Sequence, residues 1–223
     1  MIYEENTPHR TVTVLFLVLT ILLFYPLWQL GDRELYWSES SYAAMAMETD
    51  YLAPSGQAHG EIIPQAFPLL PMAAAALHNQ LKVPMELALR LPSWGALVLL
   101  ALLVWMSARH AAGATTAAVA VAILISSNII LEKAVDGYPD MVGVLFLFAG
   151  WMLWFRIGAV RGNWNLAWLV SLTCCGLAFY TIGWAGVVFF FTPLIFMRRP
   201  LTLWRKLQRP GFYIGLGVVA LFV

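Results

Sequence analysis

Carboxylates are concentrated in one short stretch of this chain, directly after its first long apolar run. Residues 31–50, GDRELYWSESSYAAMAMETD, hold five of the twelve acidic residues, beside aromatic residues typical of a membrane interface. If Ser38 caps a short helix, Glu39 falls in its first turn, where the helix dipole favours a carboxylate. At about 100° per residue, Glu39 and Tyr42 share one face with small alanines, whereas Glu48 points the opposite way. The pattern predicts either an acidic face lining a cleft or a plain interfacial helix with solvated acids.

A second candidate acid stands at the head of a later apolar helix. Asp140 directly precedes the run MVGVLFLFAGWMLW and ends the polar stretch EKAVDGYPD. A carboxylate at a membrane surface could serve as a general base or hold a divalent cation, since hard cations prefer oxygen ligands. A bound metal therefore stays an open alternative, with His59 or His78 as further ligands, although a lone surface histidine is more often a bystander. Asp136, in a Gly–Pro turn, is better explained as a turn former.

The composition indicates an integral membrane protein. The 223 residues are 61% hydrophobic and 11% charged, well below the roughly 25% charged residues of a soluble domain. The net charge of +1 argues against nucleic acid as a partner. We expect an all-α, multi-spanning helical bundle in the inner or plasma membrane, forming a single membrane domain over residues 1–223. Predicted spans lie near 11–30, 88–107, 114–131, 141–156, 166–181 and 184–197, with a final apolar run from 211 too short to span, which predicts a truncated chain.

The distribution of Lys and Arg predicts the orientation. A cytoplasmic N-terminus places nine of these residues inside and four outside, as the positive-inside rule requires. The outside four are Arg33, Lys82, Arg90 and Lys133. Ten of the twelve acids then face outside. Arg90 is the favoured phosphate ligand, because an Arg at a span end is costly unless it is paired or snorkels. A plain i,i+4 pair with Glu86 explains it equally well.

The long outer loop, residues 31–87, is not uniformly polar. Residues 67–81 are apolar and helix-prone but too short to span, and Pro64, Pro68 and Pro71 interrupt any continuous helix. We expect two short helices on the periplasmic surface, around 39–48 and 70–81, with no β-sheet between them.

These motifs, in this order, resemble those of membrane-embedded (GT-C class) glycosyltransferases, in particular the group of aminoarabinose transferases and dolichyl-phosphate-mannose protein mannosyltransferases. The first-loop motif of that group, Asp-Glu-x-x-Tyr-Ala, is similar to Ser38-Glu39-Ser40-Ser41-Tyr42-Ala43. Its Arg-Leu-Pro-Ser at the second span is matched in full by Arg90-Leu91-Pro92-Ser93, and its second acid by Asp140. The resemblance covers roughly residues 11–197.

Three charged positions of that group are absent here. Its leading Asp is replaced by Ser38, its Glu-Lys pair by Gln65 and Ala66, and the Lys of its Thr-Lys-Gly by Ile182.

The resemblance implies an inverting transfer of a sugar from a polyprenyl-phosphate donor to a lipid, glycan or protein acceptor at the outer membrane face. It implies Glu39 and Asp140 as catalytic residues, with Arg90, Arg33 and Tyr42 binding the substrate or its phosphate. Two alternatives remain open: a non-catalytic membrane protein on the same scaffold, which the lost charges favour, and a transporter. A transporter would carry ionisable groups at mid-membrane, whereas here the acids lie at the surface.

Overall fold

The structure is a computed structural model, and it describes residues 17–21, 23–25, 30, 34–35, 38–48, 57–58, 61–62, 69–196 and 203–220. Three described helices are long and apolar enough to cross a membrane: Met85–Ala112, Asp140–Val160 and Trp164–Ile182. A bent pair, Ala114–Ser126 with Asn128–Val135, would make a fourth. The predicted fold class, an all-α multi-spanning membrane protein, is confirmed. Most of the first predicted span, as well as Arg33, His59, Gln65 and Ala66, lies outside the described residues.

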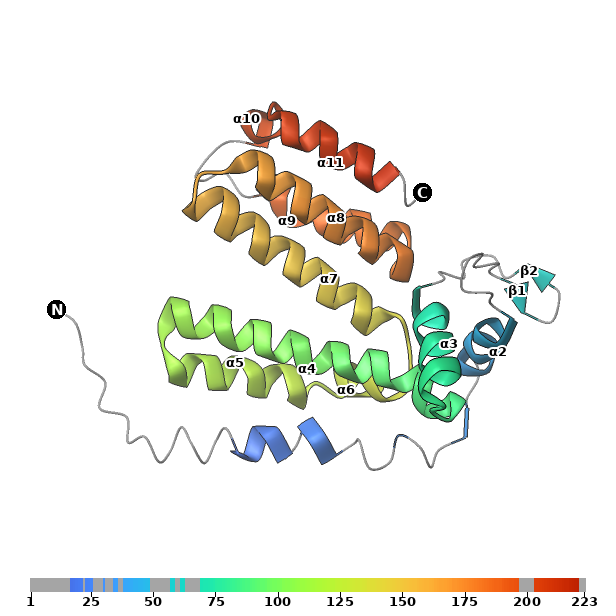
Figure 1. Ribbon diagram of the computed structural model, residues 1–223. Helices are drawn as coiled ribbons and strands as arrows, with labels where there is room; N and C mark the ends of the chain where they lie inside the picture. Colours follow the sequence, from blue (N-terminus) through green and yellow to red (C-terminus); the bar gives the residue numbers. More distant parts are fainter. Residues whose placement is uncertain are drawn as a thin grey trace.

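The long helices form a bundle in which neighbours in sequence are mostly neighbours in space (Figure 1). Helix α4 packs against both α5 and α7, while α8 packs against α7, α9 and α11. The bounds are α4 Met85–Ala112, α5 Ala114–Ser126, α6 Asn128–Val135, α7 Asp140–Leu153, η2 Trp154–Val160, α8 Trp164–Ile182, α9 Trp184–Phe196, α10 Leu203–Leu207 and α11 Pro210–Ala220. The π-helical segment η2 continues α7 directly.

The predicted span over 114–131 is not one straight helix. α5 ends at Ser126, and α6 starts at Asn128 with its axis turned by 65°. Ser127, between them, has an extended backbone (φ −72°, ψ 113°). The Ser126 hydroxyl donates to the carbonyl of Ile123. A serine hydroxyl that bonds to a nearby carbonyl offers the backbone an alternative to the helix, and hydropathy does not register such a bond.

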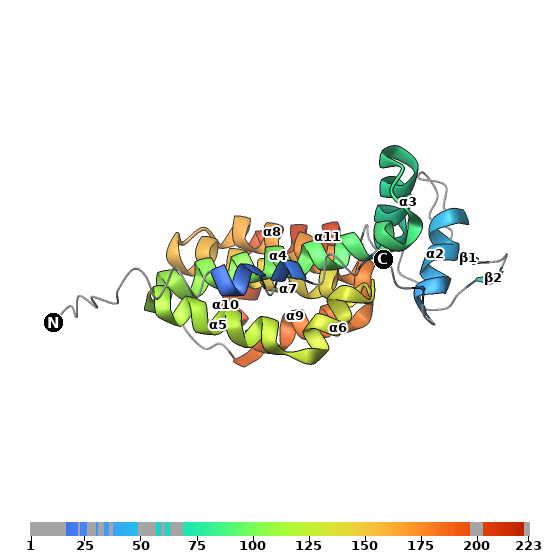
Figure 2. The ribbon, with the colours of Figure 1, turned by 90° about the horizontal axis from the view of Figure 1, so that it is seen from below.

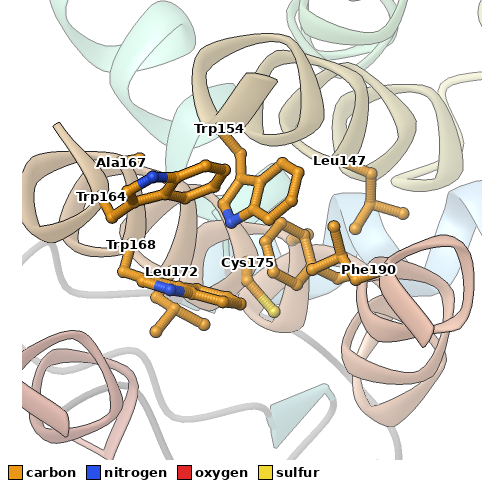
Figure 3. Close-up of a cluster of buried hydrophobic side chains, with 10 residues drawn as sticks. Leu147, Trp154, Trp164, Ala167, Trp168, Leu172, Cys175 and Phe190 are labelled. Atoms are coloured by element: carbon orange, nitrogen blue, oxygen red, sulfur yellow. The ribbon is translucent and has the colours of Figure 1, made fainter. Parts of the chain in front are cut away.

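An aromatic cluster fills the core where α7, α8 and α9 meet (Figure 3). The Trp154 ring makes edge-on contacts with Trp164 at 5.2 Å and Trp168 at 5.8 Å between centroids. Trp164, Trp168 and Leu172 are four residues apart, so they share one face of α8. The buried Trp168 indole N–H donates to the carbonyl of Lys206, which attaches α10 to the bundle.

Helix α11 packs closely on α8 at a glycine, and this contact predicts how two glycine substitutions in α11 change the stability of the protein. An added Cβ at Gly211 would overlap the backbone of Asn165, whereas one at Gly217 meets nothing within 4 Å. We expect Gly211→Ala to destabilise the protein by about 1–3 kcal/mol through overpacking. Gly217→Ala, the control in the same helix, should be neutral or stabilising by up to about 1 kcal/mol. Thermal unfolding of the detergent-purified protein compares them, and equal midpoints would contradict the close α8–α11 contact.

Two short helices lie at one end of the bundle, beyond the ends of the spans (Figures 1 and 2). They are α2, Ser38–Glu48, and α3, Leu69–Leu81, which pack against each other and against α4. Between them is a β-hairpin of two residues per strand, Gln57–Ala58 with Glu61–Ile62, antiparallel. The expectation of no β-sheet in this segment was therefore wrong. Strands of two residues are too short to show an alternating pattern, and only the glycine in the linking His59-Gly60 is typical of a hairpin.

Candidate functional site

A buried ion pair joins α2 to α4 at the end of the bundle that carries α2 and α3. Arg90 Nε donates to Glu39 Oε1 at 3.2 Å, and Arg90 Nη2 donates to Glu39 Oε2 at 3.0 Å. Each side chain is 2% exposed. Two parallel bonds from a planar guanidinium fix the carboxylate in orientation as well as position. The bidentate partner of Arg90 is therefore a carboxylate 51 residues earlier in the chain.

The same guanidinium also holds the chain that precedes α2. Arg90 Nη1 donates to the carbonyl of Leu30 at 2.7 Å, and Nη2 donates to the carbonyl of Glu34 at 2.9 Å. Because one side chain binds Glu39 and two carbonyls of the chain before α2, α2 cannot shift relative to α4 without breaking charge-assisted bonds. Arg90 thus sets the position of Glu39 and of the residues on the following turn of α2.

The loop that leads into α7 closes over this pair. Gly137 has φ +63°, and an added Cβ there would lie 3.2 Å from Glu39 Oε1 and 3.3 Å from Arg90 Cγ. Glycine meets both demands at once, the left-handed backbone and the close approach. The buried Ser93 hydroxyl donates to the carbonyl of Tyr138 at 2.7 Å. Arg90 and Ser93 are the first and last residues of Arg-Leu-Pro-Ser. Through them α4 holds α2 on one side of the site and the loop before α7 on the other.

This loop delivers Asp140 to the first turn of α7, where the helix dipole favours a carboxylate. Asp140 Oδ2 lies 3.1 Å from Lys133 Nζ, and the two side chains are 45% and 36% exposed. The Lys133 ammonium also lies 3.9 Å from the centroid of the Tyr138 ring. A carboxylate and an ammonium group thus lie side by side, both partly exposed and within reach of a ligand.

Asp140 borders a cavity of about 400 Å³. Its other lining residues are Tyr42, Pro139, Val144, Leu147, Thr181, Ile182, Ala185 and Phe189. The polar side chains, Asp140, Tyr42 and Thr181, come from three different helices, and the remainder of the wall is apolar. Such a cavity can take a ligand with a polar head and a hydrocarbon part.

Tyr42 lines the same cavity as Asp140. Burial raises the pKa of the Tyr42 phenol, and the negative charges of Asp140 and then Tyr138 raise it further. The phenol therefore keeps its proton at neutral pH and remains a hydrogen-bond donor.

The five predicted site residues divide into two groups and one residue outside the described part. Asp140 and Tyr42 line the cavity together. Glu39 and Arg90 do not line it. Glu39 lies on the turn of α2 that precedes Tyr42, and it binds Arg90 of α4. Arg33 lies outside the described residues. From the sequence, Lys133 was one of the four cations available for a phosphate, with Arg90 favoured over it. Lys133 lies seven residues before Asp140, but Gly137 and Pro139 rule out one continuous helix between them, so this spacing gave no sign of the ion pair.

The carboxylates of the described site are paired with basic side chains and are not grouped with other metal-binding residues. No group of three or more His, Cys, Asp or Glu side chains able to hold an ion occurs among the residues that the structure describes. Asp140 has an ammonium as its near neighbour, and a cation competes with a metal for the same oxygens. His78 Nδ1 bonds to the carbonyl of Val83, so this histidine belongs to the α3–α4 connection.

Comparison with known proteins gives one family. The family model described as dolichyl-phosphate-mannose-protein mannosyltransferase matches residues 64–223. The matched part includes Arg90, Ser93, Lys133 and Asp140 and begins after α2. No curated protein and no solved structure matches the chain significantly.

Proposed function

The chain belongs to the dolichyl-phosphate-mannose-protein mannosyltransferase family, a family of membrane glycosyltransferases, and from this membership we propose a specific reaction. The protein transfers a sugar from a polyprenyl-phosphate donor to an acceptor at the outer face of the membrane. The observation that carries the proposal is the cavity that Asp140 and Tyr42 line together with a mostly apolar wall.

Asp140 is the proposed general base. Its carboxylate is half-exposed and lines the cavity, so an acceptor hydroxyl can reach it. Asp140 takes the proton of that hydroxyl as the acceptor oxygen bonds to the anomeric carbon of the sugar. The bond between this carbon and the phosphate oxygen breaks, and the electron pair leaves with the polyprenyl phosphate. Glu39 is less suited to this step, since both its oxygens bind Arg90 and it is 2% exposed.

Lys133 and Tyr42 are proposed to stabilise the leaving phosphate. A cation and a neutral phenol near the developing negative charge act where that charge appears in the transition state. The apolar wall, which includes the exposed Val144 and Phe189, suits the first isoprene units of the donor. Glu39 and Arg90 hold Tyr42 and the loop before Asp140 in place.

The full chain, reconstituted in lipid vesicles, tests the reaction. Vesicles are supplied with labelled polyprenyl-phosphate sugars of several kinds and with a membrane extract as acceptor. Protein-dependent release of free polyprenyl phosphate, together with label in the acceptor, is the expected result. Two results together would favour a non-catalytic protein on the same scaffold: no release from any donor, and donor binding that is unchanged in the Asp140→Asn variant. Ser38 and Ile182, which replace charged residues of the family, support that alternative.

The proposed orientation makes a separate prediction. With Cys174 and Cys175 replaced by Ala, we expect an impermeant thiol reagent to label Glu48→Cys in intact cells. Gln208→Cys should be labelled only after permeabilisation. Both positions are exposed and stand at opposite ends of the bundle. The physical reason is the excess of Lys and Arg at the Gln208 end. The reverse labelling pattern would place the cavity on the cytoplasmic side.

A further inference from the structure

The end of the bundle opposite α2 and α3 carries a basic pocket. About 360 Å³ in volume, it is lined by Trp105, Met106, Arg109, His110 and Arg156. The first four come from the last part of α4, and Arg156 comes from η2. π-Helical segments are rare and occur frequently at functional sites. This pocket is separate from the Asp140 cavity and takes no part in the proposed transfer.

The charge around the pocket is of one sign. Every acidic side chain that the structure describes lies toward the other end of the bundle, on or beside α2, at the start of α4, at the end of α6 or at the start of α7. Arg161, Arg205 and Arg209 lie at the same end as the pocket. A pocket of arginines with no described carboxylate nearby attracts an anion, and the arginine fork matches phosphate.

An apolar groove runs from this pocket toward the middle of the bundle. The groove measures about 370 Å³ and is lined almost entirely by apolar side chains, including Leu23, Val98, Leu102 and Val121. Trp105 lines both the groove and the basic pocket. Val98, Leu102, Trp105 and Arg109 follow one another at helical spacing, so one stripe of α4 joins the two.

The length of this stripe fits one leaflet. From Val98 to Arg109 the helix rises about 16 Å at 1.5 Å per residue. This is close to half of the ~30 Å hydrocarbon core of a bilayer. A ligand that fills both parts has a phosphate at one end and a hydrocarbon chain reaching about to the bilayer centre.

We propose that the pocket and groove together bind one anionic phospholipid of the leaflet at this end. Arg109 and Arg156 bind its phosphate, Trp105 lies at the level of the ester region, and one acyl chain occupies the groove beside Leu102. Interfacial tryptophan and basic pockets between spans are the features that recognise such lipids.

The test titrates the full, detergent-purified chain with phosphatidylglycerol and with phosphatidylcholine of the same acyl chains, using native mass spectrometry. We expect phosphatidylglycerol to bind about tenfold more tightly, because each Arg at the membrane surface attracts anionic lipid. Arg109→Gln with Arg156→Gln should remove this preference. Arg109→Lys with Arg156→Lys should retain most of it, which separates loss of charge from loss of folding. Arg161→Gln, exposed at the same end but outside the pocket, is the control.

The groove has its own pair of variants. Leu102→Trp fills the groove and should weaken the binding of both lipids equally. Leu99 is about equally exposed on α4 but lies outside the groove, so Leu99→Trp should leave the binding of both lipids unchanged. Equal affinity for the two lipids, or a preference that survives the double Gln variant, would overturn the proposal. Displacement of phosphatidylglycerol by an equal concentration of inorganic phosphate would also overturn it, since the site would then be a phosphate site without a lipid component.

Discussion

Sugar transfer falls about 10²-fold or more when Asp140 is replaced by Asn, with the protein still inserted and folded. Asn keeps the size and the place at the head of α7 but cannot accept a proton, so it removes the proposed base and little else. The Asp140–Lys133 pair is half-exposed, so its loss costs under about 1 kcal/mol of stability. The measurement is initial rate in reconstituted vesicles at saturating donor, with unfolding midpoints of both proteins alongside.

The matched control for this variant is Glu132→Gln, an exposed acid on the same stretch that does not line the cavity. It should transfer sugar at nearly the native rate. Full activity of Asp140→Asn would remove Asp140 as the base, and equal losses in both variants would attribute the effect to general surface charge.

The second large effect is on stability and concerns the Glu39–Arg90 pair. Arg90→Met leaves the Glu39 carboxylate buried under Gly137 without its bidentate partner. Glu39→Leu leaves the Arg90 guanidinium buried without its carboxylate. Removing one member of a buried pair costs about 3–5 kcal/mol, since an uncompensated charge remains. We expect each single variant to unfold at a clearly lower denaturant concentration and to lose transfer, because Tyr42 and the loop before Asp140 lose their support.

The double variant, Glu39→Leu with Arg90→Met, distinguishes this mechanism from simple loss of contacts. It buries no charge, so it should recover most of the stability lost by either single variant. Lys133→Gln is the control, because a half-exposed pair contributes under about 1 kcal/mol. Single variants as stable as the native chain, or a double variant whose loss equals the sum of both, would contradict the assignment.

Hydropathy was enough to predict the all-α membrane class of this protein, because lipid requires long apolar segments with internal hydrogen bonding. The pattern over 70–81 also predicted α3 closely, since an apolar segment too short to span must lie across the end of the bundle. It did not predict the break at Ser127, because the short polar run Ser126-Ser127-Asn128 lies between apolar residues on both sides and was included in one span. The break depends on local backbone bonding, which hydropathy does not register.

The sequence identified candidate site residues but not how they are arranged. The acids at Glu39 and Asp140 stood out by their position at membrane surfaces, and Asp140 and Tyr42 do line one cavity. The pairing of Glu39 with Arg90 could not be predicted, because nothing in a spacing of 51 residues relates one to the other. The acceptors at Leu30 and Glu34 are backbone carbonyls, which leave no trace in the sequence.

The dependence of α2 on Arg90 fixes an order of events during synthesis. Glu39 leaves the ribosome long before Arg90, which belongs to the next span, so α2 emerges while its anchor is still untranslated. Over that interval the carboxylate stays hydrated, because its burial without a counter-ion is prohibitive. The segment that contains α2 can therefore dock only after α4 has inserted, and the loop with Gly137 closes over it later still. Assembly of this end of the protein thus proceeds outward from the second span, although the chain is made from the N-terminus.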